Sequence, residues 1–255
     1  MRIAVAGGTG IAGRQVVAAL RAAGHQPVVL ARSTGVDVVA GAGVDAALTG
    51  ADGLVDATNI ATSRSGPAEK FFGAAAANLV QAAARAQVGH YAVLSIVGID
   101  RVNYGYYDGK LLQERIVTES GLPYTIVRST QFHEFADQML ALAGGPCALV
   151  PRMRSQTVAV SEVGQALAEI VVGTPQGAAE IAGPEIEWMP DLARRLLKAR
   201  GSRRAVLPLW MPGSGGRAMA SGGLLPTDPD GQRGRIGFDQ WLATVGAGEA
   251  MGRGH

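Results

Sequence analysis

The sequence has one cysteine, little net charge and no basic tract, and each of these absences excludes a class of protein. A single cysteine, Cys147, cannot form an internal disulfide or a cysteine-rich metal site. The four histidines lie far apart and none is paired with carboxylates at ligand spacing, so we expect no metal site. The formal net charge is only +2 and no basic stretch is interleaved with aromatic residues, so we expect no nucleic-acid partner.

Long apolar segments are also absent. The apolar segment that begins at Phe71 is interrupted by Asn78, Gln81 and Arg85, so it falls short of the ~18 uninterrupted apolar residues of a membrane span. The first residues, MRIAVAGG, enter a strand pattern directly, without the charged and apolar regions of a signal peptide. We therefore expect a cytoplasmic protein, a monomer or a homodimer, whose partner is a small-molecule substrate and not a membrane.

Apolar residues and glycines are abundant. Hydrophobic residues make up 47% of the 255 residues, enough to bury a large core, and the 36 glycines are scattered, as in an α/β chain with many tight turns. Short β-branched runs alternate with Ala- and Leu-rich helical patterns, which indicates βαβ units in a parallel sheet. The expected strands are Arg2–Ala6, Gln26–Ala31, Val36–Val39, Gly53–Ala57, His90–Ser95 and Tyr124–Arg128, with helices that begin at Ile11, Val44, Pro67 and Tyr106.

This regularity falls after Gly144, Gly145 and Pro146, which follow a helix expected from Gln131. We then expect strands at Thr157–Val160 and Ala178–Ala182, a helix capped by Ser161 that runs to Val172, a basic helix from Pro190 to Ala199, a loop with one short helix from Pro208 to Gly231, and a last helical turn over Phe238–Val245. The chain is therefore expected to form a domain over residues 1–145, a smaller α/β lobe over 146–246 and a disordered tail over 247–255.

A glycine-rich loop separates the first expected strand from the first expected helix. Its sequence, Gly7-Gly8-Thr9-Gly10-Ile11-Ala12-Gly13, fits both G-x-x-G-x-x-G and G-x-G-x-x-G. Glycines at these spacings permit a tight turn and let the backbone approach a pyrophosphate, while the helix N-terminus offers free N–H groups and a positive dipole. Strand, loop and helix together predict a doubly wound, parallel-sheet Rossmann fold that binds a dinucleotide.

The end of the second expected strand indicates which dinucleotide. A Rossmann protein that uses NAD commonly has a carboxylate there, about 20 residues after the loop, for the ribose 2′-hydroxyl. Here the strand ends at Arg32, Ser33 and Thr34, and the next carboxylate is Asp37. A guanidinium and hydroxyls suit a 2′-phosphate, so we predict NADP(H), with NAD(H) as the alternative. An Arg32 that is simply solvated, or that stacks on adenine, is the other interpretation.

Tyr106 and Lys110 form a Tyr-x-x-x-Lys pattern, which places both side chains on one face of a helix. A nearby ammonium lowers the pKa of a tyrosine, so the pattern predicts a general acid. Ser95, at the end of the preceding strand, is positioned to face a nicotinamide. The structural alternative is that Tyr106 or Tyr107 packs in the core and Lys110 pairs with Glu114.

Several segments together resemble the NmrA-like, atypical branch of the short-chain dehydrogenase/reductase superfamily. They are GGTGIAG, LSIVGID, YYDGKLLQE and GLPYTIVRSTQFHEF, with looser similarity through VAVSEVGQALAEIV, EIAGPE and the closing FDQWLA. The resemblance covers most of the chain. The spacing from Ser95 to Tyr106 is shorter than in ordinary short-chain dehydrogenases, and members of this branch often keep the lysine while the tyrosine loses its role.

The resemblance implies a set of cofactor-binding residues. Adenosine and phosphates would be held by Gly7, Thr9, Gly10, Ile11 and Arg32; the ribose would lie over Asp56, Ala57, Thr58 and Asn59; and the nicotinamide would be surrounded by Ser95, Lys110 and the backbone of Thr130, Gln131 and Phe132.

These residues favour an NADP(H)-dependent oxidoreductase that acts on a small carbonyl-type substrate. Tyr106 would donate the proton, Lys110 would hold the ribose and tune Tyr106, and Ser95 would polarise the acceptor oxygen. Two alternatives stay open: a non-catalytic redox sensor of NmrA type that binds a partner protein, and a non-redox lyase or isomerase on the same fold.

Three further features are expected to be structural or are ambiguous. We expect His133 to be a hydrogen-bonded core histidine. A basic cluster is expected to be a solvated helix face; it comprises Arg194, Arg195, Lys198, Arg200, Arg203 and Arg204. Apolar residues in a glycine-rich loop are expected either to line the substrate pocket or to cap the core; they are Trp210, Met211, Met219, Leu224 and Leu225.

Overall fold

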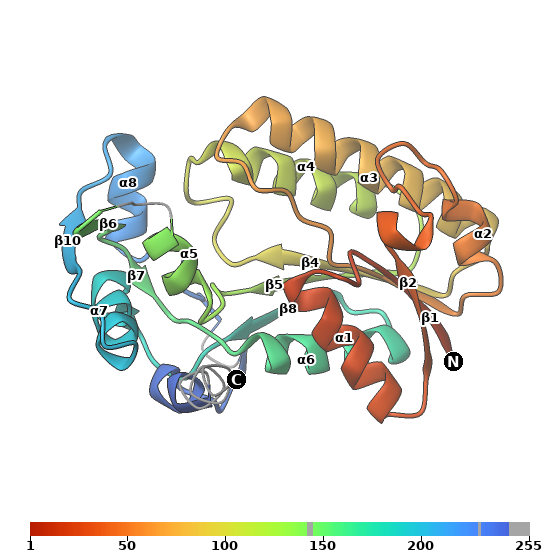
Figure 1. The fold of residues 1–255 in the computed structure, drawn as a ribbon. Helices are drawn as coiled ribbons and strands as arrows, with labels where there is room; N and C mark the ends of the chain where they lie inside the picture. The colour runs from red at the N-terminus through yellow and green to blue at the C-terminus, as the bar shows by residue number, and fades with distance from the viewer. Residues whose placement is uncertain (142–144, 229–230, 245–255) are drawn as a thin grey trace. The chain divides into compact units, whose positions relative to one another are not determined.

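The computed structural model describes residues 1–141, 145–228 and 231–244 (Figure 1). The chain divides into two compact units, which we call unit 1 (Met1–Ser129 and Val160–Glu180) and unit 2 (Thr130–Ala159 and Ile181–His255). This division differs from the boundary expected at residue 145, because the chain leaves unit 1 earlier and then returns to it for 21 residues, 160–180. The expected tail, 247–255, lies outside the described residues.

The sheet of unit 1 confirms the doubly wound α/β fold. Its strands are β1 (Arg2–Ala6), β2 (Gln26–Leu30), β3 (Gly53–Asp56), β4 (His90–Ile96), β5 (Tyr124–Ser129) and the first part of β8 (Gly177–Ala182). With β11 (Gln232–Arg233) at one edge, the seven-stranded order is β11-β8-β5-β4-β3-β1-β2. Parallel pairing joins β1 to both β2 and β3, β3 to β4, and β4 to β5. The strand order therefore reverses at β1, which is where ligands bind in sheets of this kind.

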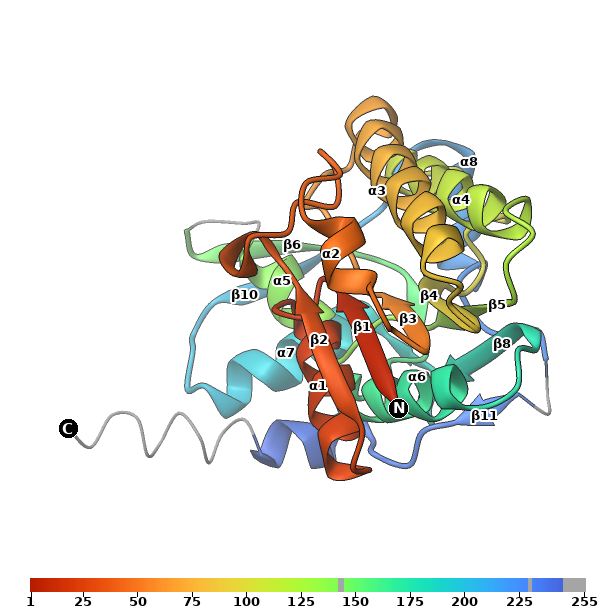
Figure 2. The same ribbon diagram turned by 90° about the vertical axis from the view of Figure 1, so that its right-hand side faces the viewer.

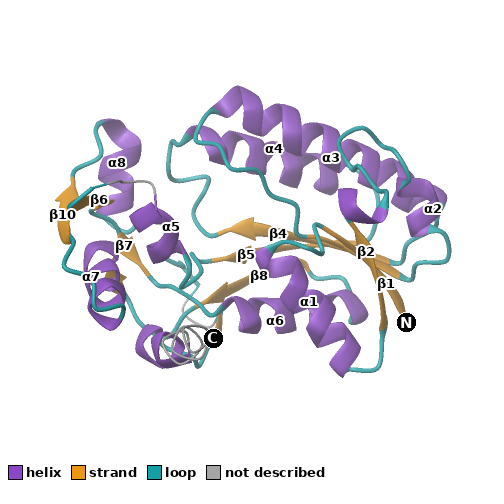
Figure 3. Cartoon of the chain, viewed as in Figure 1, coloured by secondary structure: helices purple, strands orange, loops and turns teal. Residues whose placement is uncertain are grey.

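Helices cover both faces of this sheet (Figures 2 and 3). The helices of unit 1 are α1 (Ile11–Ala22), α2 (Val44–Leu48), α3 (Ser65–Arg85), α4 (Gly105–Thr118) and α6 (Val160–Val172). In Figure 2, α2, α3 and α4 lie on one side of the strands and α1 and α6 on the other. The expected helix starts at Ile11 and Val44 are confirmed, and those at Pro67 and Tyr106 differ by two residues and one residue.

Close approach of α3 to α4 depends on small residues. A Cβ atom at Gly109 would lie 2.6 Å from the carbonyl carbon of Ala68, and one at Gly105 would lie 2.7 Å from the amide nitrogen of Ser65. Side chains at either position would push the helices apart. The two glycines of α4 thus set its distance from α3, and with it the position of Lys110 between them.

The expected strand Val36–Val39 is wrong. This segment forms turns with a single bridge between Asp37 and Ala42. The Asp37 carboxylate accepts N–H groups from Val39 (2.9 Å) and Ala40 (3.0 Å), so a side chain competes successfully with strand pairing. A short 3₁₀ turn, η1 (Arg32–Thr34), precedes it.

Unit 2 was less accurately predicted than unit 1. Its elements are α5 (Phe135–Ala141), β6 (Cys147–Pro151), β7 (Arg154–Ser155), the end of β8, β9 (Glu187–Trp188), α7 (Met189–Ala199), β10 (Ala205–Leu209), α8 (Gly213–Ala220), β11 (Gln232–Arg233) and a helical segment at 238–244. The helix expected from Gln131 begins only at Phe135, because the backbone of Gln131 and His133 bonds to Val158 (2.9 and 3.1 Å).

The expected strand Thr157–Val160 is correspondingly a single bridge between Phe132 and Val158. The helix expected from Ser161 is α6, which already begins at Val160 and ends at Val172 as expected. The expected loop from Pro208 loses its first two residues to β10. Among the described residues no helix is long and apolar enough to cross a membrane, and no three potential metal ligands come together there.

Candidate functional site

The glycine loop connects β1 to α1 in a compact turn. Gly7 has a left-handed φ of 71°, its amide donates to Leu30 O (3.1 Å), and its carbonyl accepts from the amide of Gly10 (2.8 Å). A Cβ atom at Gly13 would lie 2.2 Å from the carbonyl oxygen of Gly7, so the loop can close only on glycine there. Gly10 caps α1 without a side-chain hydrogen bond, and Thr9, Gly10 and Ile11 are exposed. The N-terminal N–H groups of α1 are thus placed to receive phosphates.

A polar turn follows β2. The Thr34 hydroxyl donates to Val29 O (2.9 Å) and accepts from the amide of Ala31 (3.1 Å), which closes the turn and presents Arg32 and Ser33 to solvent. Among the described residues the Arg32 guanidinium has no acidic partner. Asp37, the nearest following carboxylate, is occupied by its own turn. The turn therefore presents positive charge and a hydroxyl, as the sequence suggested.

Asp56, the last residue of β3, is a buried carboxylate that accepts four hydrogen bonds. They come from the Thr58 amide (3.0 Å), the Thr58 hydroxyl (2.6 Å), the Tyr91 hydroxyl (3.0 Å) and the Gln113 amide group (2.7 Å). The contact with the carboxylate and burial raise the pKa of Tyr91 well above its usual value, burial being the larger cause. Asp56 therefore fixes the backbone after β3, where Ala57, Thr58 and Asn59 were expected to contact the ribose.

Lys110 is almost completely buried, with 3% of its surface exposed. Its ammonium donates to Leu94 O (2.6 Å) and to Gln113 Oε1 (2.5 Å), and lies 4.7 Å from the centre of the Phe72 ring. Burial lowers the pKa of Lys110 to about 8, against the opposing effects of Asp56 and then Glu114. The ammonium thus lies against the backbone of β4, one residue before Ser95.

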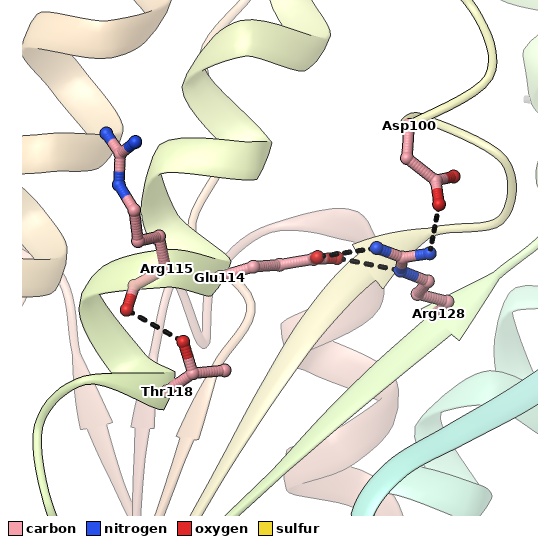
Figure 4. A network of polar contacts seen from close by, with 5 residues as sticks. All are labelled: Asp100, Glu114, Arg115, Thr118 and Arg128. Atoms are coloured by element: carbon pink, nitrogen blue, oxygen red, sulfur yellow. Dashed lines mark hydrogen bonds and ion pairs between the residues drawn. The ribbon is translucent and has the colours of Figure 1, made fainter.

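Glu114 does not pair with Lys110, so this part of the structural alternative is wrong, whereas the other part is confirmed because Tyr107 is buried. Figure 4 shows the Glu114 carboxylate beside Arg128 of β5, with bonds of 3.0 Å from Nε and 2.7 Å from Nη2. Asp100 contacts the same guanidinium at 3.5 Å. These contacts raise the pKa of Arg128, the hydrogen bond from Glu114 being the largest cause. Glu114 thus forms an ion pair with Arg128, and this pair links α4 to β5.

The Tyr106 side chain is bonded to Asn59 and packs on Phe72. Its hydroxyl donates to Asn59 Oδ1 (2.7 Å), and its ring meets the Phe72 ring edge to face at a centroid distance of 5.6 Å. Burial, and then the negative charge that Tyr104 can carry, raise the pKa of Tyr106 above its usual value. The expected lowering by Lys110 is therefore wrong for this arrangement, in which Phe72 contacts both side chains.

Ser95 is buried, and its hydroxyl lacks a hydrogen-bond partner among the described residues. The residue is 1% exposed, and its Oγ atom has no hydrogen-bond partner among the described residues. A buried hydroxyl without a partner is costly, which indicates that a further group binds there. Ser95 lies in β4, and the Lys110 ammonium bonds to the residue before it, so both groups lie at the same end of this strand.

Gln131 and His133 belong to unit 2. Both polar atoms of the Gln131 side chain are buried without a partner among the described residues. His133 is fully buried and bonds to Thr157 Oγ1 (2.8 Å) and Ile236 O (3.0 Å), as a core histidine does. Three of the six residues of the basic cluster form ion pairs: Arg194 with Asp191, Arg195 with Glu187 and Asp239, and Arg200 with Asp137.

Sequence reasoning missed three residues of the site. Gln113 and Tyr91 both bond to Asp56, and Phe72 contacts both Tyr106 and Lys110. The one available signal was the position of Gln113, three residues after Lys110 on the same helix face.

Comparison with known proteins settles the family. The model of the NAD(P)H-binding family matches residues 7–172, which include the glycine loop, the Asp56 segment, Ser95, Tyr106 and Lys110. The chain belongs to this NAD(P)H-binding family. The expected membership of an NAD(P)H-binding family is thus confirmed. No curated protein matches the sequence.

Solved structures share this fold. NADPH-dependent quinone oxidoreductase QOR2 of Escherichia coli, complexed with NADPH, is 19% identical, with 95% of this chain and 99% of that chain covered and a TM-score of 0.70. A short-chain dehydrogenase/reductase superfamily protein of Agrobacterium tumefaciens with bound NAD is 16% identical (98% and 98%, TM-score 0.72). UDP-N-acetylglucosamine 4-epimerase of Bacillus cereus is 17% identical (100% and 97%, TM-score 0.71). At these identities the likeness concerns the fold.

Proposed function

We propose that this NAD(P)H-binding protein is an NADP(H)-dependent oxidoreductase that acts on a small organic substrate of carbonyl type. The observation that carries the proposal is the pair at β4: the Lys110 ammonium bonds to Leu94 O, and the next residue, Ser95, has a buried hydroxyl without a partner. A cation and a free hydroxyl at the carboxyl end of a central strand are suited to a ribose and to a substrate oxygen.

The turn after β2 supports NADP(H) as the cofactor. The exposed Arg32 guanidinium has no acidic partner among the described residues, Ser33 adds a hydroxyl, and Asp37 is held in a turn. A guanidinium binds a phosphate through charge-assisted hydrogen bonds, whereas a ribose 2′-hydroxyl usually requires a carboxylate. NAD(H) is the alternative cofactor.

Three side chains of this chain would carry the chemistry. NADPH, when bound, would supply hydride chemistry. Ser95 would hold the carbonyl oxygen through its free hydroxyl, Tyr106 would transfer its phenolic proton to that oxygen, and Lys110 would hold the ribose. The Tyr106 hydroxyl first has to leave Asn59 Oδ1.

A redox sensor is the second candidate, favoured by one observation. The Tyr106 hydroxyl is bonded to Asn59 and its pKa is raised, so Tyr106 is not activated as a proton donor in this arrangement. A protein that binds the dinucleotide and reports its redox state to a partner does not require such a donor. A lyase or isomerase is a third candidate, since an epimerase shares the fold.

Cofactor titration followed by a turnover assay tests these candidates. Calorimetry should show tighter binding of NADPH than of NADH. Absorbance of the reduced nicotinamide should then decrease in the presence of at least one member of a panel of quinones, aldehydes and ketones. Binding of NADPH without oxidation by any member would favour the sensor, and absence of binding to either cofactor would defeat the proposal.

A further inference from the structure

A single buried amide lies between a buried anion and a buried cation in unit 1. Gln113, on α4, has no exposed surface. Its Oε1 atom accepts from the Lys110 ammonium (2.5 Å), and its Nε2 atom donates to Asp56 Oδ2 (2.7 Å). An ammonium can only donate and a carboxylate can only accept, so the charges at its two ends determine the orientation of the amide. The Gln113 amide is therefore held in one orientation by hydrogen bonds to both charged groups.

The anionic end of this link is fixed by several hydrogen-bond donors. Besides Gln113, Asp56 accepts from the amide and hydroxyl of Thr58 and from the hydroxyl of Tyr91. The two residues Asp56 and Lys110 form no direct ion pair among the described contacts, so Gln113 carries the connection between them.

The protonation of the Lys110 ammonium, the cationic end of this link, depends on the groups around it. Burial lowers the pKa of Lys110 to about 8, and Asp56 is the larger of the two opposing influences. Around Lys110, β3 contributes Asp56, α3 contributes the uncharged ring of Phe72, and α4 contributes Glu114, whose carboxylate is bound by Arg128. From β4 come the Leu94 carbonyl and Tyr91, whose hydroxyl is bound to Asp56.

We propose that Gln113 is a positioning residue, whose amide connects the Asp56 carboxylate to the Lys110 ammonium and thereby keeps Lys110 charged and fixed against β4. Its bearing on cofactor binding rests on the proposed function, in which Lys110 holds the ribose. The same amide joins Lys110 to the segment after β3, because Asp56 also fixes Thr58. The position of Lys110 is thus linked to the position of the segment after β3.

Two substitutions separate this role from simple packing. Gln113→Met keeps the length of the side chain but removes one polar partner from Lys110, which keeps Leu94 O, and one from Asp56, which keeps Thr58 and Tyr91. Gln113→Glu places a carboxyl group against the ammonium and its second oxygen beside Asp56 Oδ2, so the pair of carboxyl groups adds one negative charge near Lys110 when both are ionised. The titration midpoint of Lys110 should fall by about one pH unit in Gln113→Met and rise by about one pH unit in Gln113→Glu, since a nearby opposite charge or its loss shifts a pKa by this order. Loss of packing alone would not produce opposite shifts.

The composition of the chain makes the measurement direct. It has three lysines, and Lys70 and Lys198 are exposed. With ¹³Cε-labelled lysine, NMR titration of the protein without cofactor should show one resonance with a midpoint well below the other two. Lys70→Arg and Lys198→Arg assign the exposed lysines, and thermal unfolding of each variant checks its fold.

The outcomes decide the proposal. A Lys110 midpoint in folded Gln113→Met equal to that of the unsubstituted protein would overturn it, as would a midpoint in Gln113→Glu that does not rise. If Gln113→Met fails to fold, Gln113→Glu still decides. NADPH titration is run in parallel: if the Lys110 midpoints shift as expected but NADPH does not bind, the link stands and the proposed function fails.

Discussion

The Tyr106 hydroxyl donates a 2.7 Å hydrogen bond to Asn59 Oδ1, across 47 residues of sequence. Asn59 also accepts from the backbone amide of Ile60 (2.8 Å), so its side-chain oxygen is fixed toward the phenol. This contact joins the first turn of α4 to the segment after β3. A ribose bound over that segment would compete for the same atoms, which connects cofactor binding to the position of the candidate proton donor.

Tyr106→Phe should separate catalysis from cofactor binding. The substitution keeps the ring against Phe72 and removes only the hydroxyl. If the protein is a reductase, NADPH affinity should survive and kcat should fall roughly 10²–10⁴-fold, the usual contribution of one general acid. Calorimetry and steady-state turnover measure the two quantities. Tyr124→Phe, at the first position of β5, is a matched control, because it also removes only a phenolic hydroxyl.

Turnover that is indifferent to Tyr106→Phe would exclude Tyr106 as the donor while leaving the oxidoreductase function intact. The donor would then be water or Tyr107. In a sensor, the substitution should change neither binding nor the effect of cofactor redox state on a partner protein.

The N-terminal part of the site could be predicted because its signals are local. The glycine loop, the strand before it and the helix after it are contiguous, and β1 and the start of α1 were predicted to the residue. Gly7 and Gly13 are required by contacts within one turn. Information of this kind is present in a short stretch of sequence.

The network around Lys110 could not be predicted, because its members come from separate elements. Asp56 ends β3, Tyr91 lies in β4 and Gln113 lies in α4, and only the packing of these elements brings them together. The Tyr-x-x-x-Lys pattern correctly places Tyr106 and Lys110 on one helix, but Phe72 from α3 contacts both of them. A helical pattern contains no information on such a third side chain.

Arg32→Ala should remove most of the preference for NADPH over NADH. The guanidinium would lose its charge-assisted bonds to the 2′-phosphate, a loss of roughly 1.5–3 kcal/mol or about 10–150-fold in Kd. NADH affinity should change little, since that cofactor has no 2′-phosphate. Calorimetric titration of both cofactors measures this, with Arg21→Ala, at the far end of α1, as a charge-matched control. Equal NADPH and NADH affinities in the unsubstituted protein would make the NADP(H) assignment wrong.

Gly10→Val should abolish dinucleotide binding and preserve the fold. A Cβ atom there would meet only Gly7 O, at 3.2 Å, and the backbone at Gly10 (φ −76°, ψ 177°) is accessible to any residue. The side chain would occupy the space of the pyrophosphate. Gly13→Ala is the contrasting variant: its Cβ atom would lie 2.2 Å from Gly7 O, so it should lower the melting temperature.

Circular dichroism and cofactor titration of both variants distinguish these effects. NADPH affinity that persists in folded Gly10→Val would show that the loop is a structural turn and not the phosphate site.

His90 should make the stability of unit 1 sensitive to acid. Its Nδ1 atom bonds to Gly173 O (3.1 Å) and its Nε2 atom to Thr125 Oγ1 (2.8 Å), so the neutral ring, with Nδ1 as donor and Nε2 as acceptor, satisfies both partners. Burial lowers the pKa of His90 below 6.5, against the opposing backbone hydrogen bonds of Gly173 and Val171. Below pH 6.5 the unfolded chain therefore binds a proton that the folded protein resists, and the free energy of unfolding should fall as the pH decreases toward the folded pKa.

His90→Gln keeps an amide donor and acceptor but cannot titrate, so its free energy of unfolding should depend less on pH in this range. Urea unfolding of both proteins at a series of pH values between neutral and mildly acidic measures the difference, and parallel pH profiles would contradict the assignment of the acid sensitivity to His90.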